Sequence, residues 1–254
     1  GLGGIIFPIV FRQLQLRAGF GWAMRTIAFL MLVTQLFALS LLRTRVVPAG
    51  TRKLIDVSVI RDFPFLMVLA TSLTAYAAIY IPFVYVSTFG FQRGLADVNL
   101  AFWLIPIVNG ASIPGRLIPA IIADKFTGVV NMVTFILFAT GILCFSWIAV
   151  DTRAGLIVFA IFAGFLSGAV LSLFALAPFP FIKDPKLVGT RTGMVAAFAG
   201  LGALFGIPVA GLLVNNGHSY LQLQTYSGGL LVGASVLALL ARLMATEWKL
   251  FAKF

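Results

Sequence analysis

The chain has 254 residues, of which 61% are hydrophobic and 10% are charged, and its mean hydropathy is +1.09. This leaves too little polar surface to cover a soluble globule of that size, so the composition excludes an ordinary water-soluble domain and indicates a protein embedded in lipid. The formal net charge of +11 does not indicate a nucleic-acid binder, because the basic residues are spread between hydrophobic stretches rather than gathered on one soluble face.

Long uncharged stretches follow one another along the chain, and about 20 apolar residues cross the hydrocarbon core of a bilayer as a helix. Backbone groups in lipid must be paired within the structure, and these stretches lack the alternation of barrel strands, so helices are predicted. An apolar opening stretch at 1–13 precedes seven predicted spans, near 22–42, 63–89, 98–121, 127–149, 154–180, 189–214 and 226–246. The predicted fold class is therefore an all-α polytopic membrane protein.

The opening stretch begins without Met and ends at Arg12 without a cleavage-type small-residue site, so it is not typical of a signal peptide. We interpret it as the end of a helix whose beginning lies upstream, and we expect the chain to be a fragment of a longer protein.

The basic residues predict the orientation of the chain in the membrane. The side that holds the 43–62 loop collects 12 of the 18 Lys and Arg residues, so this loop and the C-terminus are expected to be cytoplasmic.

Residues that could support catalysis are sparse. The single cysteine, Cys144, lies within an apolar span, and the single histidine, His218, lies in the polar connecting segment 215–218. The sequence contains no metal-binding CxxC, no HExxH, no GxSxG and no P-loop, so neither an enzyme nor a metal or cofactor site is predicted. A transporter, a channel or a non-catalytic receptor remains.

Arg116 is the only charge predicted to lie clearly inside a span. Asn109 and Ser112 precede it by seven and four residues, and this spacing predicts a polar stripe on one helix face. Because polar groups inside a membrane are costly and tend to mark a path, the stripe suits an anionic or carbonyl-bearing ligand in a water-filled cavity. In the alternative interpretation Arg116 snorkels to the cytoplasmic interface and pairs with Asp124 or with loop carbonyls.

A second polar stripe runs along the 63–89 span, where Ser72, Tyr76 and Tyr80 recur every four residues. Tyrosines near the outer end could form an aromatic belt, but Tyr76 is predicted to lie too deep for one. Tyr76 and Tyr80 are therefore candidates to line the cavity. The Gly-x-x-x-Gly motifs at 164–168 and 202–206 predict close helix packing, and several prolines predict bends.

Four segments carry a family resemblance. Residues 115–125 resemble helix 8 and the loop 8–9 signature of the major facilitator superfamily, in its monocarboxylate-porter branch. Residues 189–194 and the glycines that follow them resemble helix 11 of that branch, and residues 80–90 resemble its helix 7. The opening Gly-Gly-Ile-Ile-Phe-Pro and residues 21–25 are similar to helix 5 and the entry to helix 6. Fungal members, which include riboflavin-transporter-like proteins, are the most similar.

The resemblance implies a division of the chain. Residues 1–42 would be the end of the N-terminal bundle, as a remnant of helix 5 and helix 6. Residues 43–62 would be the cytoplasmic central loop, and residues 63–254 the C-terminal six-helix bundle, helices 7–12, with a short cytoplasmic tail. The remaining N-terminal helices of the same parent protein would be missing partners of this fragment.

The resemblance also implies secondary-active transport of a small organic solute by alternating access, with Arg116 engaging a substrate carboxylate and Asn109, Ser112, Tyr76 and Tyr80 lining the cavity. Proton-coupled members carry Asp at the position of Ser112, so we expect transport to depend weakly on external pH. Gly115, Asp124 and Lys125 are expected to act in gating, although Asp124 and Lys125 also fit an ordinary solvated turn.

Alternatives to the anionic solute remain open, namely a neutral or heterocyclic solute such as riboflavin, or a transport-inactive sensor or accessory subunit. The expected partners are the lipid bilayer and the solute, and the expected location is the plasma membrane.

Overall fold

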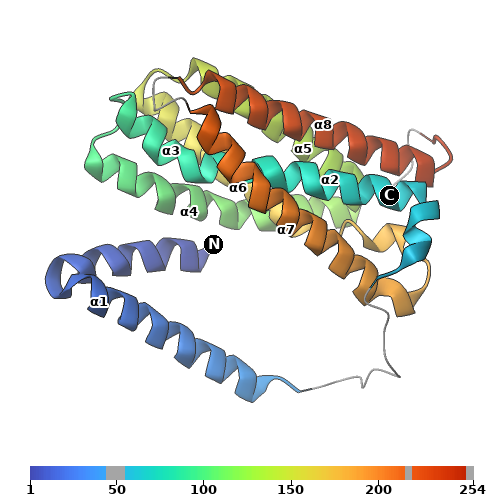
Figure 1. Cartoon of the computed structure of the whole chain (residues 1–254), viewed down its shortest axis with the longest axis horizontal. Helices are drawn as coiled ribbons and strands as arrows, with labels where there is room; N and C mark the ends of the chain where they lie inside the picture. The colour runs from blue at the N-terminus through green and yellow to red at the C-terminus, as the bar shows by residue number, and fades with distance from the viewer. Residues whose placement is uncertain (44–54, 215–218, 250–254) are drawn as a thin grey trace.

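The computed structural model describes residues 1–43, 55–214 and 219–249, and in these ranges all regular structure is helical (Figure 1). The long helices are α1 (Leu2–Leu41), α2 (Phe63–Ile79), α3 (Ile81–Gln92), α4 (Val98–Ile122), α5 (Val129–Ser146), α6 (Arg153–Leu173), α7 (Val188–Leu213) and α8 (Leu221–Ala245). With α2 and α3 taken as one span, the described residues form seven spans long and apolar enough to cross a membrane. The predicted all-α membrane fold is confirmed.

Short helical turns connect several of these helices: η1 (Val57–Arg61), η2 (Ala123–Thr127), η3 (Trp147–Ala149), η4 (Phe179–Phe181) and η5 (Pro185–Leu187). In the predicted central loop at 43–62, residues 44–54 lie outside the described residues, and so do the polar segment 215–218 with His218 and the tail at 250–254. The described remainder of the loop contains η1, which leads directly into α2.

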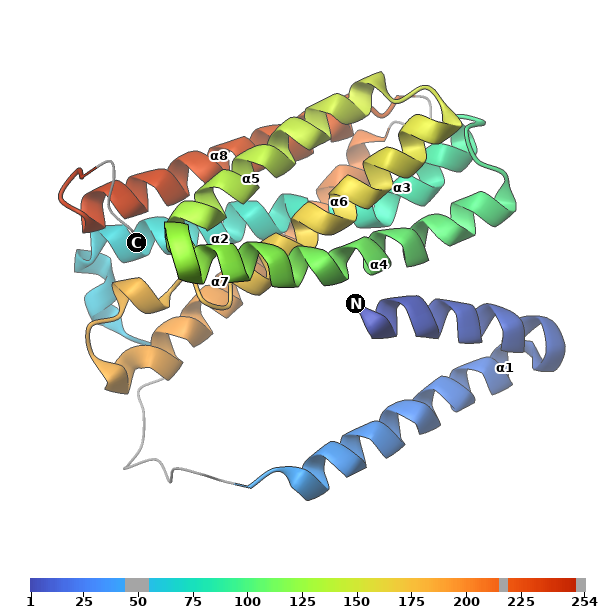
Figure 2. The same ribbon diagram turned by 180° about the vertical axis from the view of Figure 1, so that it is seen from behind.

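The opening stretch at 1–13 and the predicted span at 22–42 form the two arms of α1. Gly19 separates them, with φ 81° and ψ 169°, a conformation that glycine adopts without the steric penalty of a side chain. The first arm runs beside α4, and the second turns away toward the opposite end of the molecule (Figures 1 and 2). The two arms of α1 therefore point in different directions within one element.

The predicted span at 63–89 is a pair of helices, because α2 ends at Ile79 and α3 begins at Ile81. Pro82 explains the break, since proline lacks the N–H of a helical hydrogen bond and its ring clashes with the preceding turn. A proline does not always end a helix in this chain. Pro106, Pro114 and Pro119 all lie inside α4, which stays continuous.

Both predicted glycine motifs are helix contacts, as expected. Gly164 and Gly168 bring α6 against the backbone of α4, and Gly202 and Gly206 bring α7 against the backbone of α2. At each of these four positions a Cβ atom would overlap a backbone atom of the neighbouring helix. Helix α2 packs against both α7 and α8, α5 joins α8 to α6, and α4 covers the other side of α6 (Figures 1 and 2).

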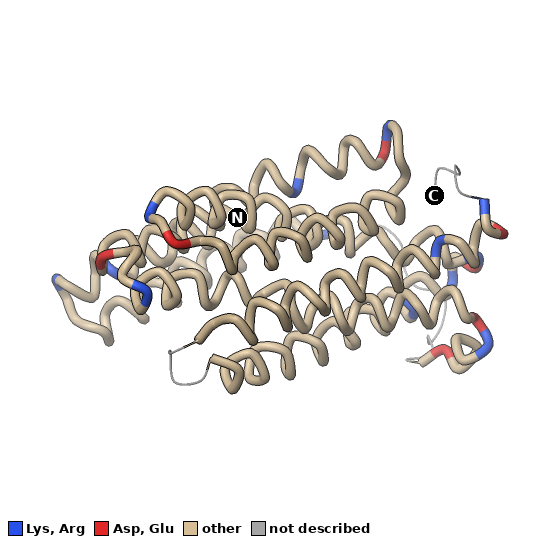
Figure 3. Tube along the Cα trace, turned by 90° about the horizontal axis from the view of Figure 1, so that it is seen from above, with Lys and Arg blue, Asp and Glu red and all other residues tan. Residues whose placement is uncertain are grey.

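Charged residues gather mainly at the two ends of this bundle (Figure 3). We call one the Asp62 end; it contains 55–62, 123–128, 182–187 and 246–249. We call the other the Gly94 end; it contains 92–97 and 150–153. The helices between them present large exposed apolar side chains, such as Phe135, Phe138 and Leu204. Such a surface suits contact with lipid acyl chains, because it lies in a belt between two polar ends.

Candidate functional site

Arg116 is exposed on α4, well inside the helix. It precedes Asp124 by eight residues, or about 12 Å along a helix axis. Among the described residues it forms no salt bridge, since the three that occur involve Arg153 and Arg191. The guanidinium is therefore open to whatever fills the space beside α4.

Asn109 lies on the same side of α4 as Arg116. Its side chain is half-buried, lies against Gly4 in the first arm of α1, and donates through Nδ2 to the carbonyl of Ile105 at 3.0 Å. Asn109 and Arg116 are seven residues apart, which is nearly two helical turns and returns to the same face. The structure therefore brings these two predicted site residues onto one side of α4.

The side chain of Ser112 lies on a different side of α4. Its side chain is only 1% exposed, its hydroxyl donates to the carbonyl of Asn109 at 2.7 Å, and its backbone packs against Gly168 of α6. At roughly 100° per residue, Ser112 is turned about 40° from Arg116 and about 60° from Asn109, which is enough to carry it into the α4–α6 interface. The close approach of α6 therefore interrupts the predicted stripe at Ser112, and a role of the three residues in binding a solute stays a prediction.

Gly115 also faces α6, where it lies against the carbonyl of Phe165. A Cβ at this position would overlap that backbone, so Gly115 acts as a contact residue between two helices. Asp124 and Lys125 lie in η2 at the Asp62 end, both with exposed side chains. The turn ends at Gly128, whose φ of 85° again favours glycine.

Tyr76 and Tyr80 lie together on the inner side of the α2–α3 span, and both are half-buried. Their ring centroids are 6.0 Å apart, and the Tyr76 ring meets that of Phe174, the residue directly after α6, edge to face at 5.5 Å. A cavity of about 270 Å³ adjoins Tyr76 between α2, α6 and the first turns of α7. Tyr76 therefore borders this pocket, and its contact with a solute stays a prediction.

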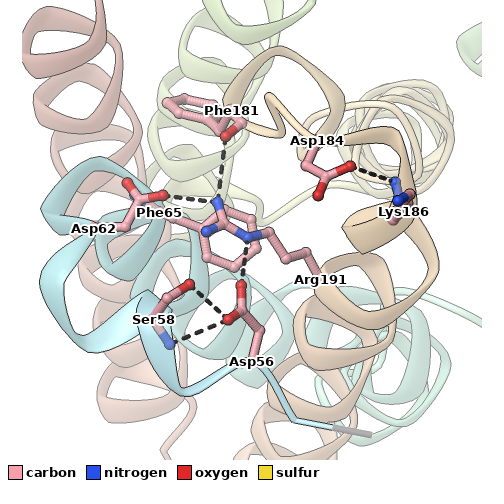
Figure 4. A network of polar contacts seen from close by, with 8 residues as sticks. All are labelled: Asp56, Ser58, Asp62, Phe65, Phe181, Asp184, Lys186 and Arg191. Carbon is pink, nitrogen blue, oxygen red and sulfur yellow. Dashed lines mark hydrogen bonds and ion pairs between the residues drawn. The ribbon is translucent and has the colours of Figure 1, made fainter. Parts of the chain in front are cut away.

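Arg191 is the most heavily bonded polar residue that sequence reasoning missed. Its Nε donates to Asp56 at 3.0 Å and its Nη1 to Asp62 at 2.7 Å, and its guanidinium carbon lies 4.8 Å from the ring centre of Phe65 (Figure 4). Nη1 also reaches the carbonyl of Phe181 at 3.4 Å. Arg191 therefore ties the start of α7 to η1, to the first turn of α2 and to η4.

The carboxylate of Asp56 accepts hydrogen bonds from the hydroxyl of Ser58 at 2.6 Å and from its N–H at 3.1 Å. The bond from the Ser58 hydroxyl, together with those from Arg191 and the Ser58 N–H, holds the pKa of Asp56 below its ordinary value, although burial opposes this shift. The sequence shows two acidic residues, Asp56 and Asp62, shortly before the 63–89 span, and these were its only sign of this ion-pair cluster. No pattern in the sequence connected them with Arg191.

A second missed contact joins α1 to α4 at the Gly94 end. Arg12 donates through Nη2 to the side-chain oxygen of Asn99 at 2.6 Å, and its guanidinium carbon lies 4.3 Å from the centre of the Phe102 ring. Together with the contact of Gly4 and Asn109, this fixes the first arm of α1 along the face of α4 that carries Arg116.

Several fungal proteins are similar to this chain over most of its length. The MFS-type transporter dbaD of Emericella nidulans is 38% identical over 229 residues, which are 89% of this chain and 51% of the relative. The aspyridones efflux protein apdF of the same organism is 34% identical over 96% of this chain and 50% of the relative. The agnestins efflux protein AgnL12 of Paecilomyces divaricatus is 32% identical over 95% of this chain and 55% of the relative. No family model matches the chain.

The chain thus spans about half the length of the curated relatives it matches. These relatives are named as transporters or efflux proteins rather than as enzymes. The similarity supports the superfamily that the sequence motifs indicated and, with the seven apolar spans, an integral multi-pass membrane protein.

Proposed function

We propose that this chain is part of a major facilitator superfamily transporter of the monocarboxylate-porter-like branch, which moves a small organic solute across a membrane by alternating access. The similarity to fungal MFS-type transporters supports the superfamily, and the motifs at 80–90, 115–125 and 189–194 support the branch. Two relatives are named for the efflux of aspyridones and of agnestins, so we propose export as the direction of transport.

In this proposal residues 1–42 belong to the end of the N-terminal bundle, 43–62 form the central loop, and 63–254 form the C-terminal bundle with its tail. The Asp62 end is cytoplasmic, because the side of the chain that holds the 43–62 loop collects 12 of the 18 Lys and Arg residues. Asp124 and Lys125 contribute to the gate at this end, where both are exposed in the turn that follows α4. The location proposed for the protein is the plasma membrane.

The proposal that the solute carries an anionic group rests on Arg116. Placing an arginine at the centre of a membrane helix costs roughly 2.5–3.5 kcal/mol on insertion scales, so water or a ligand must offset this cost. The side chain of Arg116 is exposed, has no salt-bridge partner in the described part of the chain, and lies on the same side of α4 as Asn109. A carboxylate or another anionic group on the solute would supply that partner.

A second candidate is a neutral aromatic or heterocyclic solute. The cavity beside Tyr76 favours it, because every residue that lines this cavity is uncharged.

The test measures export of radiolabelled benzoate from cells that express the full-length coding sequence. We expect Arg116→Gln to lower benzoate export at least tenfold at unchanged membrane abundance, because a charge-assisted hydrogen bond contributes roughly 1.5–3 kcal/mol. Arg17→Gln is the matched control, since Arg17 is an exposed arginine of α1, two residues before the bend at Gly19. Wild-type export by Arg116→Gln would contradict the anion site. If the wild type exports neither benzoate nor riboflavin, a transport-inactive sensor becomes the better interpretation.

A further inference from the structure

The first arm of α1 meets α4 along a contact that is nearly free of polar bonds. A Cβ atom at Gly4 of α1 would overlap the side chain of Asn109, and a Cβ atom at Gly110 of α4 would lie 3.7 Å from the side chain of Ile5. Small residues on both helices let the two backbones approach closely. Along most of its length the contact between the two helices therefore depends on van der Waals packing.

Arg12 makes the one polar bond across this contact. Among the described residues, its 2.6 Å bond to the side-chain oxygen of Asn99 is the only hydrogen bond between α1 and another helix. The same guanidinium lies over the ring of Phe102, with its carbon 4.3 Å from the ring centre. Both partners belong to the first two turns of α4, so the polar bond joins the two helices at the Gly94 end.

The two helices joined by Arg12 belong to different bundles in the proposed division of the chain. The first arm of α1 belongs to the N-terminal bundle and α4 to the C-terminal bundle, and alternating access requires the two bundles to move relative to each other. The second arm, beyond Gly19, turns away from α4, and Ala23 is its only buried residue (Figures 1 and 2). A bond that joins the bundles at one end must break when that end opens.

The exposure of this bond suits a contact that breaks and forms again. Asn99 is exposed and Arg12 is half-buried, so water can replace the bond when the helices separate. A hydrogen bond with such replacement changes an equilibrium only roughly three- to tenfold. The cluster around Arg191 differs, because it is buried and its opening would leave a charge unpaired in the interior.

We propose that Arg12 closes the outer gate of the transporter: its contacts with Asn99 and Phe102 hold the two bundles together at the Gly94 end, and they break when this end opens. In the proposed orientation the Gly94 end faces the outside, because the Asp62 end is cytoplasmic. The inference rests on the proposed transport function and assigns a gating residue to it. Arg12 is a positioning residue, because it acts on the distance between the bundles.

The test measures distances between two spin labels on the purified full-length protein in lipid nanodiscs, without solute. The labels are attached to Arg17→Cys on α1 and Val98→Cys on α4, two exposed positions, in a background whose native cysteines are replaced by serine. Arg12→Met removes every donor and should raise the ratio of long to short distances roughly three- to tenfold. Arg25→Met is the matched control and should leave this ratio unchanged, because Arg25 lies over the ring of Trp22 within α1 itself.

A second variant covers the case in which Arg12→Met does not fold. Asn99→Leu removes the acceptor from the other helix and should raise the same ratio by a smaller factor, because Phe102 still contacts the guanidinium. Adding Asn99→Leu to Arg12→Met should change the ratio little further, since both remove one bond.

Wild-type distances in both Arg12→Met and Asn99→Leu, including a single short distance in all three proteins, would overturn the inference. An equal rise in Arg25→Met would also overturn it. This failure is distinct from that of the transport proposal, because the labels are read without solute. The gate assignment can fail while benzoate export still depends on Arg116, and it can hold in a protein that does not export benzoate.

Discussion

Replacing Arg191 by methionine tests whether its buried ion-pair cluster holds the Asp62 end together. The side chain of Arg191 is 9% exposed, and those of its partners Asp56 and Asp62 are 10% and 30% exposed. Breaking a buried pair by removing one partner costs roughly 3–5 kcal/mol, because the other charge is left buried and unpaired. Asp56 keeps its two bonds from Ser58 and Asp62 is partly hydrated, so we expect the lower value, about 3 kcal/mol.

The single cysteine of the chain provides the assay. Cys144 is fully buried, so a thiol-reactive fluorescent dye reports unfolding as the protein is heated in detergent. About 3 kcal/mol corresponds to a fall in Tm of roughly 6–12 °C for a protein of this size. Arg153→Met is the matched control: its pair with Asp97 is 3.5 Å long with both side chains more than half exposed, so Tm should change little. The reasoning is refuted if Arg191→Met melts no lower than Arg153→Met.

Two further predictions use the same dye assay. Gly168→Ala should lower the free energy of unfolding by about 1–3 kcal/mol, because the added methyl group overlaps the backbone of Ser112. The control Gly193→Ala should not lower it, because a Cβ at Gly193 meets no atom within 4 Å. Equal effects of the two changes would contradict the packing interpretation. The Tm difference between wild type and Asp56→Asn should stay constant above about pH 5. Because folding lowers the pKa of Asp56, its stabilising effect is complete above the unfolded value of about 3.9 and is lost as the pH falls through the lower folded value. A difference that shrinks between pH 8 and 6 would show that another group is responsible.

The sequence predicted the membrane spans well, because long uncharged stretches and glycine motifs are local signals. The break between α2 and α3 at Tyr80 also has a local cause, because Pro82 lies in the first turn of α3. Three prolines lie inside α4 without breaking it, so proline alone did not predict where a helix ends. Arg116 stood out because it interrupts an apolar stretch. Arg191 did not, since it lies at the edge of such a stretch and its carboxylate partners come 135 and 129 residues earlier. Contacts over that separation depend on how the helices pack.

The two faces of α4 separate stability from the proposed binding of solute. Gly115 and Ser112 lie against α6, where any larger side chain must displace backbone atoms, so changes there act on folding. Asn109 and Arg116 lie on the side of α4 along which the first arm of α1 runs, where neither side chain is sealed by α6, so changes there leave the α4–α6 contact in place. The two sides of α4 therefore have different neighbours, α6 on one and the first arm of α1 on the other. The close approach of Gly164 and Gly168 achieves this here, because it buries Ser112 and leaves Arg116 outside the interface.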